Sequence, residues 1–127
     1  MCAAFQATAA DHPDLVARLS NSPIHQPADY SQTDLIPALV EGKPLQHFQQ
    51  ACRLVGTFEA DGTTCEIDGL GMRDRTWGFR EESGQWAEYA GLVGVFDSAG
   101  DQVFVTAMKF LGVDGTLKAD GFVIDKD

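Results

Sequence analysis

The sequence is poor in basic residues. Only 9 of its 127 residues are Lys or Arg, whereas 19 are Asp or Glu, and the formal net charge is −10. Nucleic acids and anionic membranes are both bound through basic patches on the protein. The charge therefore argues against nucleic acid and against a membrane surface as partners.

Long apolar runs are also missing. No stretch of 18 or more apolar residues occurs, so the sequence predicts no transmembrane helix. The first five residues lack the positive charge and the apolar core of a signal peptide. The cysteines Cys2, Cys52 and Cys65 are odd in number and lack metal-site spacing, which favours a reduced protein. These absences together predict a cytoplasmic location.

The signatures of common enzyme and cofactor sites are absent too. The sequence has no P-loop, no dinucleotide-binding fingerprint followed by a helix, no nucleophile elbow and no helical zinc-protease motif. The three histidines, His12, His25 and His47, do not have the spacing of zinc ligands. We therefore expect neither a cofactor nor a metal site.

What is present from residue 46 onward is the pattern of an antiparallel β domain, residues 46–127. Alternating or apolar segments are separated by turn signals such as Asp61-Gly62 and Asp114-Gly115. The predicted strands cover residues 48–59, 64–68, 72–79, 86–96, 103–111 and 117–124. The fold class is accordingly mainly β, an antiparallel meander of about six strands.

Residues 1–45 differ in pattern and are predicted to form an N-terminal arm. Asp11 is a suitable N-cap, Pro13 is tolerated in a first helical turn, and the apolar residues that follow recur at helical spacing. These features predict a short helix over residues 12–21. Residues 34–40 fit either a second short helix or irregular structure, with an edge strand as the competing interpretation.

The few basic residues gather at one place. Three of the nine lie within residues 73–80 and surround a single acid and a tryptophan. If residues 72–79 are a strand, alternation puts Arg73, Arg75, Trp77 and Phe79 on one face and Met72, Asp74, Thr76 and Gly78 on the other. Arg75 would then stack on Trp77 as a cation–π pair. The alternative is an ordinary strand with a structural Arg–Asp network.

This segment, R-D-R-T-W-G-F-R from Arg73 to Arg80, resembles the R-D-x-S/T-W-G-x-R signature of a lipocalin-like superfamily. That superfamily includes the AttH-like and carotenoid 1,2-hydratase (hydroxyneurosporene synthase) proteins. Residues 47–56 resemble the H-Y-E-Q-x-x-R-x-x-G strand that precedes the signature, with Phe48 in place of Tyr and Gln49 in place of Glu. The resemblance runs from about residue 46 to residue 127 and covers about one half of a longer member.

The resemblance implies a lipocalin-like (calycin-like) meander or partial barrel. In relatives that hydrate or isomerise polyenes, it suggests a buried carboxylic acid that protonates a double bond, and Asp74 is the matching residue. Such an acid must hold its proton, which burial favours. The arginines on either side of Asp74 favour an ionised, structural carboxylate instead.

We predict that the domain binds an apolar or amphipathic small molecule and forms a homodimer, because strands that are apolar on both sides leave surface to cover. The predicted ligand-binding residues are Arg73, Arg75, Trp77, Phe79, Arg80, Trp86 and Tyr89. Phe104, Met108 and Phe110 are further candidates for the same apolar face. Two alternatives stay open: a non-catalytic structural or interaction module, and an isomerase- or hydratase-like enzyme on a terpenoid or polyketide with Asp74 as the acid.

Overall fold

The computed structural model describes residues 3–9, 12–33, 35–36, 45–78, 86–98 and 100–125. Its contacts divide the chain into two compact units. The first unit comprises Met1–Ile24 and Ala51–Met72, and the second comprises His25–Gln50 and Arg73–Asp127. Each unit is therefore assembled from two separate segments of the chain.

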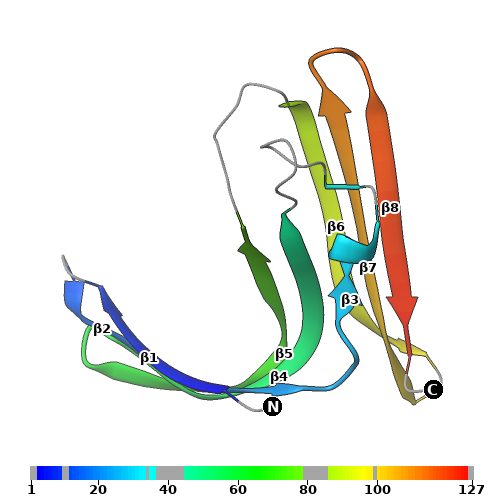
Figure 1. The fold of residues 1–127 in the computed structure, drawn as a ribbon. Coiled ribbons are helices and arrows are strands. Elements are labelled where there is room, and N and C mark those ends of the chain that lie inside the picture. The colour runs from blue at the N-terminus through cyan, green and yellow to red at the C-terminus, as the bar shows by residue number, and fades with distance from the viewer. Residues whose placement is uncertain are drawn as a thin grey trace. The chain divides into compact units, whose positions relative to one another are not determined.

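The first unit is built from antiparallel strands (Figure 1). Strand β1 (Ala3–Ala9) pairs with β2 (His12–Pro23), and β2 pairs with β4 (Gln46–Ala60). Strand β5 (Thr63–Trp77) pairs with β4 in turn. Both β4 and β5 continue into the second unit, since the division between the units falls within each of them.

The turn between β4 and β5 forms at Asp61 and Gly62, as the sequence predicts. Both residues have positive φ, 49° and 74°, which is the backbone conformation of a tight two-residue hairpin turn. Beyond the turn, the segments 64–68 and 72–79 that the sequence predicts as separate strands are joined. From Thr63 to Trp77 they form one continuous strand, β5.

The helix predicted over residues 12–21 is wrong, because these residues form β2. Between Val16 and Asn21, β2 has a partner strand on each side, β1 and β4. Backbone hydrogen bonding to two neighbours stabilises a strand more than a short isolated helix would be stabilised. Pro13 falls where the β1–β2 register shifts, and there its missing N–H breaks no regular ladder.

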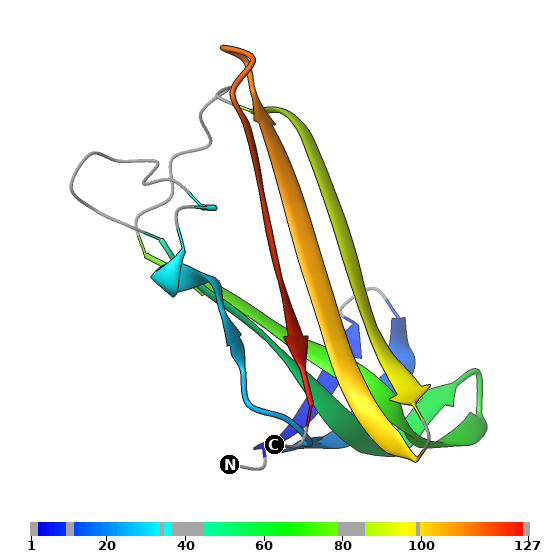
Figure 2. The ribbon, with the colours of Figure 1, turned by 90° about the vertical axis from the view of Figure 1, so that its right-hand side faces the viewer.

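The second unit contains a three-stranded antiparallel meander in the order β6–β7–β8 (Figure 2). Its strands are β6 (Trp86–Ser98), β7 (Asp101–Gly112) and β8 (Leu117–Ile124). A two-residue strand, β3 (Ala28–Asp29), pairs with Phe48 and Gln49 at the start of β4. The prediction of a mainly β, antiparallel fold is confirmed.

Helix is confined, in the described part of the chain, to one 3₁₀ turn, η1 (Tyr30–Gln32). The Asp29 side chain caps it by accepting a hydrogen bond from Ser31 N. Of the ambiguous segment 34–40, only Leu35 and Ile36 are described, and they lie in neither helix nor strand. No helix in the described ranges has the length and apolar character needed to cross a membrane.

The core of the second unit lies where η1 meets the meander. Tyr30 and Phe104 are completely buried, and Met108 is almost so. The ring of Tyr30 meets Phe122 of β8 edge-on, with centroids 4.8 Å apart. This aromatic contact joins the N-terminal part of the unit to its C-terminal strand.

Candidate functional site

The second unit contains a cavity of about 400 Å³ that is open to solvent on one side. The described residues that line it come from four strands and from the segments beside η1 and β4: Ile36, Leu45, His47, Asp74, Thr76, Trp86, Tyr89, Met108 and Phe110. Six of these side chains are apolar or aromatic, and three are polar. A volume of this size with mostly apolar walls and a few polar groups is characteristic of small-molecule sites.

Three aromatic rings form one wall of the cavity. The ring centroid of Phe110 lies 4.8 Å from that of Trp86 and 5.0 Å from that of Tyr89. Residues three apart on a regular strand would point to opposite faces, yet Trp86 and Tyr89 share this wall. The register of β6 shifts between Trp86 and Glu88, and such a bulge brings the two rings to the same face.

The position of Tyr89 depends on a glycine beside it. A Cβ atom placed on Gly91 would lie only 2.7 Å from the Tyr89 hydroxyl and 3.8 Å from Met108 Cγ. The missing side chain at Gly91 thus leaves the space across which Tyr89 lies. Met108 and Phe110 are two residues apart on β7, so they point to the same face and complete the apolar wall.

The polar residues of the cavity come from β4 and β5. Asp74 and Thr76 share a face of β5 because they are two residues apart. His47 Nδ1 is 2.7 Å from Thr76 Oγ1 and 3.8 Å from Asp74 Oδ1. The Asp74 side chain is 45% exposed, whereas the His47 side chain is 7% exposed. Asp74 is therefore the charged group that solvent or a ligand can reach.

A chain of hydrogen bonds connects Asp74 to buried side chains. Gln49 Nε2 donates to Asp74 Oδ2 over 2.9 Å, and Gln49 Oε1 accepts from the Thr106 hydroxyl. Since the Thr106 hydrogen goes to Gln49, the Tyr30 hydroxyl donates to Thr106 Oγ1, 2.9 Å away. Tyr30, Gln49 and Thr106 are all buried. The chain fixes the Gln49 amide so that its N–H group faces the carboxylate.

His47 is an uncharged member of this site near neutral pH. Burial lowers the pKa of His47 because the charged ring would lose its hydration, while the nearby Asp74 carboxylate acts in the opposite direction. Its Nε2 atom is buried and has no hydrogen-bond partner in the described part of the chain. A proton on Nε2 would therefore be left without an acceptor.

A protein-family model matches almost the whole length of the chain. Residues 4–127 match the model of a family described as Domain of unknown function (DUF7064). The chain belongs to the DUF7064 family. No curated protein and no solved structure matches it.

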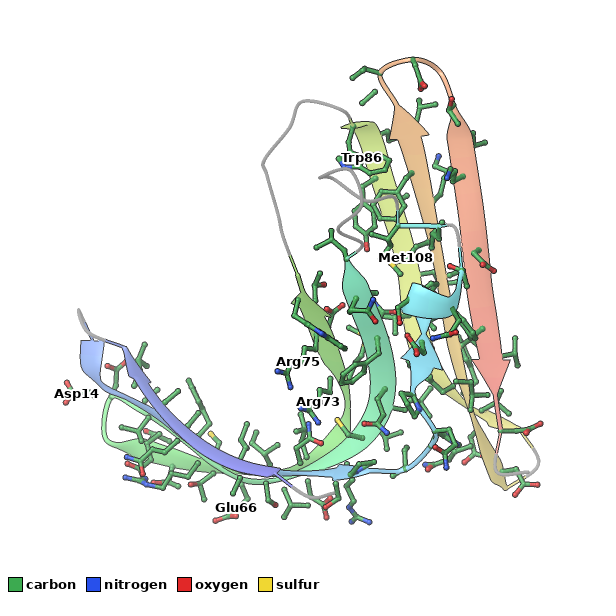
Figure 3. All side chains as sticks on the ribbon, viewed as in Figure 1. Asp14, Glu66, Arg73, Arg75, Trp86 and Met108 are labelled. Atoms are coloured by element: carbon green, nitrogen blue, oxygen red, sulfur yellow. The ribbon has the colours of Figure 1, made fainter. Side chains whose placement is uncertain are left out.

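In this DUF7064 protein, the residues that the sequence predicts for the site separate into groups. Trp86 and Tyr89 line the cavity, and so does Asp74. Arg73, Arg75 and Trp77 lie on the other face of β5, and Figure 3 shows both arginines to the left of that strand while Trp86 and Met108 lie to its right. Phe79 and Arg80 lie outside the described residues.

The arginines contact aromatic rings on their own face. The guanidinium carbon of Arg75 is 5.3 Å from the centroid of Trp77, so the predicted cation–π pair is confirmed. Arg73 lies in the same way over Phe48, at 5.4 Å, and Phe48 meets Trp77 edge-on at 6.0 Å. The hydrogen bond to Asp74 comes from the Gln49 amide.

Sequence reasoning did not assign the other polar residues of the site. His47 and Thr76 line the cavity, and Gln49 supports it. Thr76 has the same strand parity as Asp74, which is a signal that could have placed it there. Among the described residues, no three His, Cys, Asp or Glu side chains form a group that could hold a metal ion.

Proposed function

We propose that this chain binds an apolar or amphipathic small molecule in the cavity of its second unit, on a lipocalin-like β scaffold. The observation that carries the proposal is the cavity of about 400 Å³. Its apolar side chains offer contact area, and a single group of polar side chains, His47, Asp74 and Thr76, offers orientation. Apolar burial contributes affinity of about 25 cal/mol per Å² before the cost of association.

Binding is favoured over acid catalysis by the hydrogen bonding of Asp74. A general acid must hold a proton that it can donate. Asp74 Oδ2 instead accepts an N–H hydrogen from Gln49, a contact that suits a carboxylate acceptor. The alternative of an enzyme with Asp74 as the proton donor thus has less support than a binding site.

Tryptophan fluorescence tests the proposal, because Trp86 lines the cavity and Trp77 does not. The Trp77→Phe variant retains Trp86 as its sole tryptophan, and the Trp86→Phe variant is its matched control. Titration with the neutral apolar probe N-phenyl-1-naphthylamine should quench Trp86 emission in a saturable way and leave Trp77 emission almost unchanged. A linear, non-saturable response in both variants would contradict the proposal.

A second candidate function, self-association, is favoured by the outer face of the meander. On the face of β6–β7–β8 away from the cavity, Leu92, Phe96, Leu117 and Val123 are 59%, 51%, 61% and 73% exposed. Strand register places these side chains on one face, with Leu92 opposite Ala107 and Phe96 opposite Val103. We propose that a second copy of the chain covers this face in a two-fold dimer.

Light scattering tests this association. The protein at micromolar concentration should have about twice the chain mass of 13.7 kDa. Leu92→Asp should convert it to a monomer by placing a charge within the apolar face. Val113→Asp is the control, because Val113 is 67% exposed but lies in the β7–β8 turn. A wild-type monomer would refute the dimer and leave the cavity proposal unaffected.

A further inference from the structure

The described lining of the cavity is apolar except for one group of polar side chains, and that group includes a carboxylate. Asp74 carries the one carboxylate among the described lining residues, and none of them is Lys or Arg. His47 beside it is neutral near pH 7, because burial lowers its pKa. The described lining therefore presents a negative charge within mostly apolar surroundings.

The aromatic wall of the same cavity also favours positive charge. The faces of Trp, Tyr and Phe rings carry a partial negative charge and attract cations, most strongly when the cation is removed from water. Trp86, Tyr89 and Phe110 lie together at this wall. Asp74 lines the same cavity as these rings, so one bound molecule can contact both the rings and the carboxylate.

One oxygen of the Asp74 carboxylate is available to accept a hydrogen bond from a cationic group. Its Oδ2 atom is occupied by the Gln49 amide. Its Oδ1 atom lies 3.8 Å from His47 Nδ1, which is beyond hydrogen-bonding distance. One carboxylate oxygen thus has acceptor capacity left for a ligand, and 45% of the side chain is exposed.

Two described arginines of β5, Arg73 and Arg75, do not line the cavity. Arg73 and Arg75 lie against Phe48 and Trp77, on the face of β5 opposite Asp74. Strand alternation thus places the two basic groups away from the cavity and the acidic group toward it. The charges of the described residues around the cavity therefore suit a cationic ligand better than an anionic one.

We propose that the cavity takes a cationic amphiphile, an amine or quaternary ammonium with a compact apolar body. Its cationic head lies between the Asp74 carboxylate and the rings of Trp86, Tyr89 and Phe110, and its body packs against Met108 and Ile36. This inference rests on the proposed function and adds the charge of the ligand to it.

Three probes with one apolar body and different charge test the inference by titration calorimetry. They are 1-aminoadamantane, 1-adamantanol and adamantane-1-carboxylate, which are cationic, neutral and anionic at neutral pH. The cation should bind at least about tenfold more tightly than the alcohol. The carboxylate should bind most weakly, because it meets the Asp74 charge.

Asp74→Asn should remove the preference for the cation and leave the affinity for the alcohol within about twofold, since the side chain keeps its shape and loses its charge. Glu66→Gln is the matched control. It removes one negative charge from an exposed position of the first unit and should leave the preference intact.

Should Asp74→Asn fail to fold, ionic strength provides a second measurement on the unmodified protein. Affinity for the cation should fall as salt rises from about 20 mM to about 200 mM, and affinity for the alcohol should not. Equal binding of the alcohol and the cation, or a preference for the carboxylate, would overturn the charge inference and leave the proposed function standing. Failure of all three probes to bind would overturn the charge inference alone if N-phenyl-1-naphthylamine still quenched Trp86 emission in a saturable way, and would overturn both if it did not.

Discussion

The two units of the chain are stabilised in different ways. In the first unit, the described side-chain ion pairs, Arg18–Glu59 and Arg53–Asp68, lie at the surface. The second unit also has an exposed ion pair, Lys109–Glu88, but in addition its polar contacts between Tyr30, Thr106 and Gln49 are buried. Exposed charge pairs contribute little to stability, whereas buried polar groups are costly when they lose a partner.

The difference indicates where sequence constraints should be strongest. We expect the first unit to depend mainly on backbone pairing between β1, β2 and β4. The second unit depends on particular side chains that meet from distant parts of the chain. The cavity adjoins these side chains, so the structural and the binding requirements coincide there.

The largest effect that we expect is at Gly56, within the strand pairing of the first unit. Gly56 has φ of 155°, and a Cβ atom there would lie 2.0 Å from the backbone oxygen of Arg18. Gly56→Ala must separate β2 from β4 and should lower the free energy of unfolding by about 2–4 kcal/mol. Urea denaturation measures this change.

Gly69 on β5 is the matched control for that substitution. A Cβ atom at Gly69 would meet nothing within 4 Å, so Gly69→Ala should change the unfolding free energy by less than about 1 kcal/mol. Equal effects of the two substitutions would show that backbone pairing at Gly56 does not limit the stability of the first unit.

The next effect concerns the buried hydrogen bonds of the second unit. Gln49→Leu leaves the Thr106 hydroxyl without its acceptor and Asp74 without its amide donor. The cost should be about 1–3 kcal/mol, the usual penalty for a buried polar group that loses its partner. Thr106→Val in the same background should then cost less than it does in the wild type, because the contact is already lost.

A double-mutant cycle with these two substitutions measures the coupling between them. Gln50→Leu serves as the control, since Gln50 donates to His25 O and not to Thr106. Additive effects of Gln49→Leu and Thr106→Val would mean that the two side chains do not act as a unit.

The sequence was sufficient to predict the class of fold and the faces of β5. Alternation places Asp74 opposite Arg73 and Arg75, and the structure confirms that division. The turn at Asp61-Gly62 follows from local chemistry alone. These features depend on residues that are neighbours in the sequence, so the sequence pattern alone is enough to predict them.

Other features could not be predicted because they depend on distant residues. Residues 12–21 fit a helix when they are considered alone, and the two partner strands of β2 decide against it. The contact between Gln49 and Thr106 spans 57 positions of sequence. The bulge that brings Trp86 and Tyr89 to one face has no sequence signature that we could identify.

Acid should destabilise the second unit through His47. Its pKa in the folded protein lies below the ordinary value of 6.5, because the ring is buried. Between the two values, the unfolded chain binds a proton that the folded chain does not, so the unfolding free energy falls as pH drops below 6.5. The slope is at most about 1.4 kcal/mol per pH unit.

The difference between wild type and His47→Gln isolates this contribution, since all other titrating groups are common to both proteins. Denaturation at about pH 7.5 and about pH 5.5 brackets the transition. The wild type should lose more stability than the variant over this interval. Equal losses would show that His47 accepts its proton as readily in the folded protein as in the unfolded chain.

The smallest effect should come from the surface ion pair of the first unit. The side chains of Arg18 and Glu59 are 48% and 38% exposed, so water screens their attraction and each loses rotamer freedom in the pair. A double-mutant cycle with Arg18→Ala and Glu59→Ala should give a coupling below about 1 kcal/mol, smaller than the coupling between Gln49 and Thr106. If the surface pair gave the larger coupling, the contrast between the two units would be wrong, because the first unit would then depend on particular side chains as much as the second does.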